Sequence, residues 1–64
     1  MNESELSGII SGKKIKAIRR DREDGEITIS FEDGSYININ ALNDDYCSIE
    51  YTDTAAKWHD IEGD

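Results

Sequence analysis

The stretch that most constrains the fold is EITISFEDGSYININ, residues 26–40, where two isoleucine-rich runs flank Asp33-Gly34. In each run apolar and polar residues alternate, which is typical of a strand with one buried face, and Asp-Gly between two such runs indicates a hairpin. A two-residue loop would place Ile29 opposite Asn38 and divide the isoleucines between the two faces of the sheet. The two-residue loop is therefore disfavoured.

A three-residue loop, residues 32–34, gives a better register. It pairs Ile29 with Ile37 and Ile27 with Ile39, so the apolar side chains of both strands share one face. We predict a type I turn followed by a bulge, with Gly34 in the left-handed conformation that a side chain resists.

Two further strands are expected on either side of this hairpin. The run KKIKAIRR, residues 13–20, predicts a strand with Ile15 and Ala17 on one face and Ile18 on the other, and Asp24-Gly25 marks the reversal that follows it. The run YCSIEY, residues 46–51, predicts a fourth strand with Cys47 on the same side as Ile49 and Tyr51.

The two ends of the chain have weaker patterns. Residues 1–12 are interpreted as a polar lead-in or a short helical turn, and residues 52–64 as a helix or helical turn, with an edge strand or a flexible tail as the alternatives. The prediction is one mainly β domain, a four-stranded sheet over residues 13–51. We expect this small antiparallel sheet to curl into an SH3-like barrel or roll, with a short C-terminal helix.

The charge is strongly divided along the chain. The net charge is −8 over 64 residues, yet six of the seven basic residues fall between positions 13 and 22, so that residues 1–22 carry +3 and residues 23–64 carry −11. This balance disfavours direct nucleic-acid binding, which needs a basic face to displace the counterions of phosphates. The basic stretch is interpreted as an edge strand whose lysines prevent pairing with another sheet.

A single cysteine excludes an internal disulfide, and no apolar run approaches the length of a membrane span. No basic and apolar leader opens the sequence, so we expect a cytoplasmic location and no membrane association. Cys47 is expected to be a buried structural cysteine. An enzyme using Cys47 with His59 as base, oriented by Asp44 or Asp45, is disfavoured because these residues lack the spacing of a ligand or catalytic pair. No enzymatic activity, cofactor or metal is expected.

Three segments resemble a family of small bacterial and phage domains of unknown function. They are the GKKI run at residues 12–15, ISFEDGSYINI at residues 29–39 and DDYCSIEY at residues 44–51, which are similar to the family's GK-I strand, F-x-DG hairpin and H-x-DCCE-V segment. The likeness spans residues 11–51. The family's histidine is absent here, and its double cysteine is replaced by Tyr46-Cys47. The resemblance implies a β-rich fold and a phage or mobile-element origin.

The remaining functional feature is the acidity of residues 23–64. We predict a protein-binding domain whose carboxylates contact a basic protein surface, as a phage-encoded inhibitor of a host nucleic-acid-handling or defence protein does. The alternative is an accessory interaction module, homodimeric in one form, in which the acidity serves only solubility. The predicted partner-binding residues are Glu23, Asp24, Glu26, Glu32, Asp33, Asp44, Asp45, Glu50 and Asp53.

Overall fold

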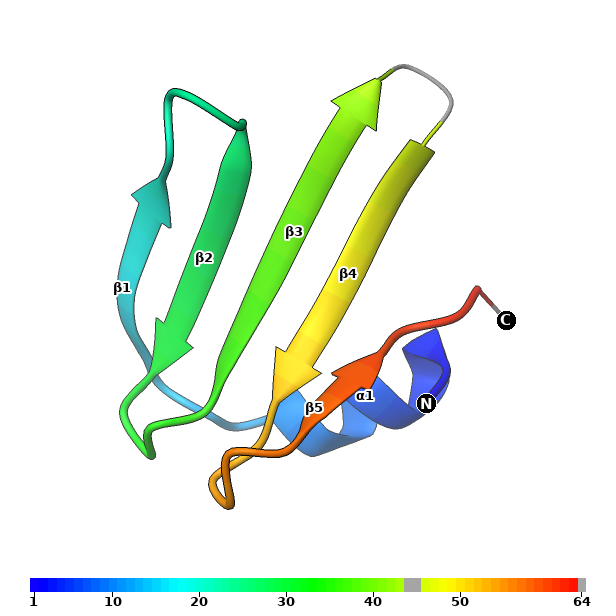
Figure 1. Ribbon diagram of the computed structural model, residues 1–64. Helices are drawn as coiled ribbons and strands as arrows, with labels where there is room; N and C mark the ends of the chain where they lie inside the picture. The colour runs from blue at the N-terminus through cyan, green and yellow to red at the C-terminus, as the bar shows by residue number, and fades with distance from the viewer. Residues whose placement is uncertain (44–45, 64) are drawn as a thin grey trace.

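The chain forms one five-stranded antiparallel sheet and one short helix (Figure 1). The computed structural model describes residues 1–43 and 46–63. The strands follow each other in the sheet in the order of the sequence, so every connection is a hairpin between neighbours. The elements are α1 (Glu3–Ile10), β1 (Ile15–Arg20), β2 (Glu26–Phe31), β3 (Tyr36–Asn43), β4 (Tyr46–Thr52) and β5 (Trp58–Asp60).

The central hairpin has the predicted register. Ile29 pairs with Ile37 and Ile27 with Ile39, and the amide of Phe31 donates to the carbonyl of Ser35 across a three-residue loop. Gly34 has a φ of 93°, the left-handed conformation that was predicted for it. The isoleucines of β2 and β3 therefore share one face.

Strand β1 is an edge strand, as its lysines indicated, but its predicted facing is wrong. Ile15 pairs with Phe31 while Ala17 pairs with Ser30, so a β-bulge at Lys16 shifts the side-chain alternation by one residue. As a result Ile18 lies opposite Ile29, on the same side of the sheet as Ile15. The polar lysine side chain is placed at the bulge, and both isoleucines face the apolar side.

Residues 1–12 contain the helix α1, which agrees with the helical alternative and not with the polar lead-in. The side chain of Asn2 accepts the amide of Glu5, and the Glu5 carboxylate accepts the amide of Asn2, which together form a capping box at the start of α1. Leu6 is buried against the sheet in a core with Phe31 and Ile37. The amphipathic helix is thus fixed by its cap and by one buried leucine.

The C-terminal segment forms an edge strand, which corrects the preference for a helix. Asp53 accepts hydrogen bonds from the amides of Ala55 and Lys57, and the resulting tight turn sends the chain back along β4. β5 then pairs with β4, with Tyr51 opposite His59. The amide of Asp53 donates to the carbonyl of Lys57 and Ala56 has a positive φ of 65°, so the chain reverses here and the helical spacing of the apolar residues is overridden.

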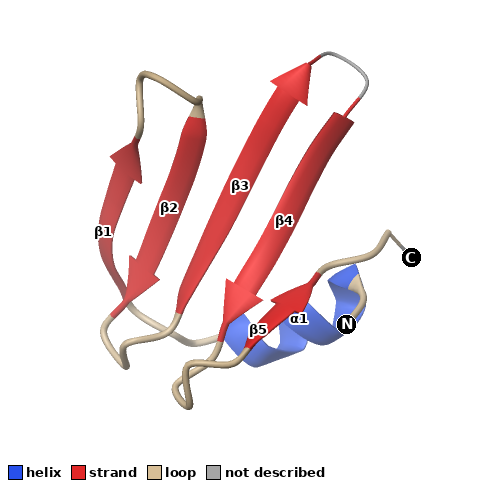
Figure 2. Ribbon diagram, in the orientation of Figure 1, coloured by secondary structure: helices blue, strands red, loops and turns tan. Residues whose placement is uncertain are grey.

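The sheet is open and has five strands, where four strands curled into a barrel or roll were predicted. β1 and β5 are its two edges in the described part of the chain and do not pair with each other. Figure 2 shows α1 behind the lower ends of β4 and β5, and Leu6 reaches the core residues Phe31, Ile37 and Tyr51, while no residue of β1 belongs to that core. The sheet consequently has an α1 side, which holds the core, and a second side that no element of the described residues covers.

Candidate functional site

The most concentrated polar chemistry lies where β1 begins. Lys13 Nζ forms an ion pair with Asp33 and donates to Ser35 Oγ at 3.2 Å. The same ammonium lies 5.9 Å from the ring centroid of Phe31 and 5.8 Å from that of Tyr51. Four residues, from β2, β4 and the β2–β3 turn, therefore gather around one lysine.

This Lys13 cluster contains the residue types of a serine–lysine nucleophile pair, but its geometry is structural. The hydrogen bond to Asp33 raises the pKa of Lys13, which keeps the amine protonated and unable to act as a base. Ser35 is fully buried, so no substrate reaches its hydroxyl. Hydrogen bonds from Lys13 and then from Ser35 lower the pKa of Asp33 to about 2. The cluster fastens the start of β1 to the β2–β3 turn.

The structure separates the cysteine and histidine considered for catalysis. His59 lies opposite Tyr51, four residues along β4 from Cys47, a separation of about 14 Å along the strand. His59 Nε2 instead lies 3.0 Å from Asp53 Oδ2, and this contact chiefly lowers the pKa of Asp53. Cys47 is exposed, which corrects the expectation of a buried cysteine, and Asp44 and Asp45 lie outside the described residues.

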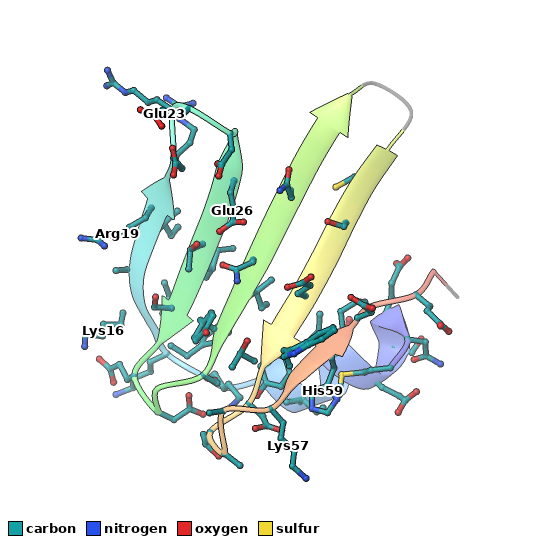
Figure 3. The ribbon with its side chains drawn as sticks, viewed as in Figure 1. Lys16, Arg19, Glu23, Glu26, Lys57 and His59 are labelled. Atoms are coloured by element: carbon teal, nitrogen blue, oxygen red, sulfur yellow. The ribbon has the colours of Figure 1, made fainter. Side chains whose placement is uncertain are left out.

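The seven predicted acids that the structure describes do not form one continuous face. Glu23 and Asp24 lie in the β1–β2 turn, whereas Glu32, Asp33 and Asp53 lie in the turns at the other end of the sheet. The two ends are about 17 Å apart along β2. Figure 3 shows Glu23 at the end opposite Lys57 and His59. Asp33 and Asp53 also have structural roles in their turns.

Two of the predicted acids, Glu26 and Glu50, lie on the side of the sheet opposite α1, which we call the polar face. Cross-strand pairing aligns its central row through Thr28, Asn38 and Glu50, and Thr28 Oγ1 donates to Asn38 Oδ1 at 2.8 Å. No described element covers this face (Figures 1 and 2). Its members are Arg19, Glu26, Thr28, Ser30, Tyr36, Asn38, Asn40, Ser48, Glu50, Thr52, Trp58 and Asp60.

The outer half of the polar face holds two carboxylates in direct opposition. Glu50 on β4 pairs with Asp60 on β5, and in the described part of the chain neither carboxylate forms an ion pair. Trp58 lies two residues from Asp60 on the same strand and is 63% exposed. Sequence reasoning counted Asp60 among the acids of residues 23–64 but did not place it opposite Glu50 or beside Trp58, because that position depends on β5, for which a helix was preferred.

A surface hollow of about 550 Å³ lies beside the β1–β2 turn. Its lining combines three guanidinium groups with two carboxylates, and the residues from Arg19 through the turn are exposed. The mixed charge and the lack of a buried polar group give no single ligand a built site. The lining residues are Arg19, Arg20, Asp21, Arg22, Glu26 and Thr28.

Residues 1–43 and 46–63 hold neither a metal cluster nor a membrane-spanning helix. In this part of the chain no group of three or more His, Cys, Asp or Glu residues is placed to hold a metal ion. The one helix described there, α1, is too short to cross a membrane.

The chain matches no protein-family model, no curated protein and no solved structure.

Proposed function

We propose that the chain is a small non-enzymatic domain that binds a basic protein surface through its polar face. The observation that carries the proposal is the opposition of Glu50 and Asp60 on an uncovered sheet. Like charges at directly opposed positions of an antiparallel pair destabilise it, and nothing in the fold requires carboxylates there. An arginine or lysine from a partner removes that repulsion and gains two charge-assisted hydrogen bonds.

Trp58 supplies the apolar part of the same surface. An exposed tryptophan beside polar and charged groups is the type of side chain that contributes most to protein interfaces, because it combines a large area with a hydrogen-bond donor. Tyr36 lies on the same face, since it pairs with Thr52 and Thr52 pairs with Trp58. The carboxylates attract a cationic partner and the aromatic residues provide contact area once it is bound.

The finer proposal concerns the kind of partner. The net charge of −8 favours fast, steered association with a strongly basic protein. The cationic groove of a nucleic-acid-handling or defence protein is such a surface, and occupying it makes the domain an inhibitor. The family resemblance noted above supports a phage origin, and a free thiol at Cys47 suits the reducing cytoplasm.

The experiment uses two variants with equal net charge. The polar-face variant carries Glu26→Gln, Glu50→Gln and Asp60→Asn, and the control variant carries Glu23→Gln, Glu32→Gln and Glu62→Gln, all exposed and away from that face. Each protein is immobilised through the thiol of Cys47, which shares the α1 side with Ile49. Bacterial lysate is applied at low salt, and bound proteins are eluted with a salt gradient and identified.

The proposal predicts that wild type and the control variant retain the same basic protein and release it as salt rises, while the polar-face variant does not retain it. Equal loss of capture in both variants would show that net charge alone acts. Capture that survives high salt in all three proteins would favour an apolar interaction module.

A further inference from the structure

The α1 side of the sheet is only half covered, and the uncovered half is apolar. Cross-strand pairing places Ile15, Ile18 and Ile27 on the α1 side, next to Phe31, Ile29 and Ile39 respectively. Phe31, Ile29 and Ile39 belong to the core or pack against it, whereas Ile15, Ile18 and Ile27 do not. Ile15 is 57% exposed and Ile18 is 65% exposed. We call these three isoleucines the open half.

From this surface we infer that two copies of the chain form a symmetric dimer through their α1 sides. The inference goes beyond the proposed function and does not rest on it, because it uses the opposite face of the sheet. The exposed area of the chain supports such a dimer. The chain exposes 4861 Å². A folded monomer of 7.2 kDa is expected to expose about 4,100 Å², so the excess is about 750 Å². A stable interface of standard size buries about 800 Å² on each partner.

The shape of the α1 side also suits a symmetric dimer. A symmetric interface uses the same surface on both copies, so that surface must contain both a recess and a projection that fits it. α1 is the projection on this side of the sheet (Figure 2), and the open half, whose isoleucines lie outside the core, is the surface that receives it. Ile9 in the last turn of α1 is 40% exposed and available for contact. The helix of each copy covers the open half of the other.

The charges on the two halves of the α1 side select the symmetry axis. A two-fold axis parallel to the strands reverses the strand order, which places β1 of one copy opposite α1, β4 and β5 of the other. The basic side chain of Arg20, which pairs with Ile27 on the α1 side, then faces the half that carries the exposed acids Glu3 and Glu62. An axis perpendicular to the strands, or edge pairing of two β1 strands, sets the basic strands against each other. Only the parallel axis brings opposite charges together.

The test is sedimentation equilibrium of the full chain and of variants at exposed positions. Because these side chains are already exposed, we expect their substitution to leave the fold of the monomer intact. Wild type is expected at twice the monomer mass of 7.2 kDa, and Ile18→Asp is expected to weaken the dimer about 100-fold or more. Trp58→Asp is the matched control, since it puts the same charge on the polar face and should leave the dimer intact. Far-ultraviolet circular dichroism checks folding, and Ile18→Thr, which keeps a β-branched side chain, replaces Ile18→Asp if that variant unfolds.

The axis is tested by the sign of one charge reversal. Arg20→Glu should weaken the dimer about fivefold, and adding Glu3→Arg should restore it. Strengthening by Arg20→Glu alone would mean that two β1 strands face each other and would overturn the arrangement. A wild-type chain that remains monomeric up to about 1 mM would overturn the dimer itself. Dissociation by Trp58→Asp with no effect of Ile18→Asp would place the interface on the polar face and contradict the inference.

Discussion

Substitution of Gly34 separates backbone strain from packing in this fold. Gly34 has a φ of 93°, and a Cβ built there meets no atom within 4 Å. The added side chain therefore costs conformational strain alone. We expect Gly34→Ala to lower the free energy of unfolding by about 1 kcal/mol and Gly34→Val, which is β-branched, by about 2 kcal/mol. In a chain of this size each kcal/mol lowers the melting temperature by about 4–8 °C.

Substitutions at two other positions are expected to raise the free energy of unfolding and serve as controls. Gly8 in α1 also has open space around a built Cβ but lacks a positive φ, so Gly8→Ala should stabilise the chain by up to about 1 kcal/mol. Ala56 has a φ of 65°, so Ala56→Gly relieves backbone strain but also adds conformational entropy to the unfolded chain. The difference between the two effects should raise the free energy of unfolding by about 0.5 kcal/mol.

The assay is urea unfolding of the four variants Gly34→Ala, Gly34→Val, Gly8→Ala and Ala56→Gly, followed by circular dichroism at one protein concentration. A gain in stability at Gly34, or a loss at Gly8 equal to that at Gly34, would refute the reasoning from backbone conformation. An unchanged denaturant slope shows that the native and unfolded states remain comparable.

Three further predictions concern an ion pair, a helix cap and an exposed thiol. Because hydrogen bonds from Lys13 and Ser35 lower the pKa of Asp33 from 3.8 to about 2 in the folded chain, this stabilisation is present above about pH 4 and is lost as the pH falls toward 2. Urea unfolding between pH 5 and pH 2 should therefore depend less on pH in Asp33→Asn than in wild type, and an equal dependence would count against the ion pair. Asn2→Ala removes the capping box and should lower the free energy of unfolding by about 1 kcal/mol, measured by urea unfolding, whereas no loss would mean that the cap contributes nothing. The exposed thiol of Cys47 should react with a disulfide reagent at micromolar protein concentration without denaturant, and a requirement for denaturant would show that it is buried.

The central hairpin was predictable because the turn at Asp33-Gly34 and the alternation of apolar and polar residues predict the same strand register. Only a three-residue loop puts Ile29 opposite Ile37, and the structure has that pairing and the positive φ at Gly34. The helix had a readable signal as well, since Asn2 and Glu5 have capping-box spacing immediately before Leu6.

Other features depend on contacts that the alternation of apolar and polar residues does not predict. The bulge between Ile15 and Ala17 changes which side Ile18 faces, and nothing in the run of lysines and isoleucines marks its position. The C-terminal apolar residues have helical spacing, but hydrogen bonds to Asp53 close a turn first. Glu50 was recognised as an acid of the site, but its opposition to Asp60 follows only from the pairing of β5 with β4.

The central claim is that the chain binds a basic protein through its polar face. The most direct measurement is an NMR titration of the isotope-labelled chain with the protein captured at low salt. The account predicts chemical-shift changes at Asn38 and Glu50 and at the indole of Trp58, with the amides of α1 unaffected and the changes reversed by salt. Changes confined to α1 and the isoleucines of β1, or none at all, would contradict the claim.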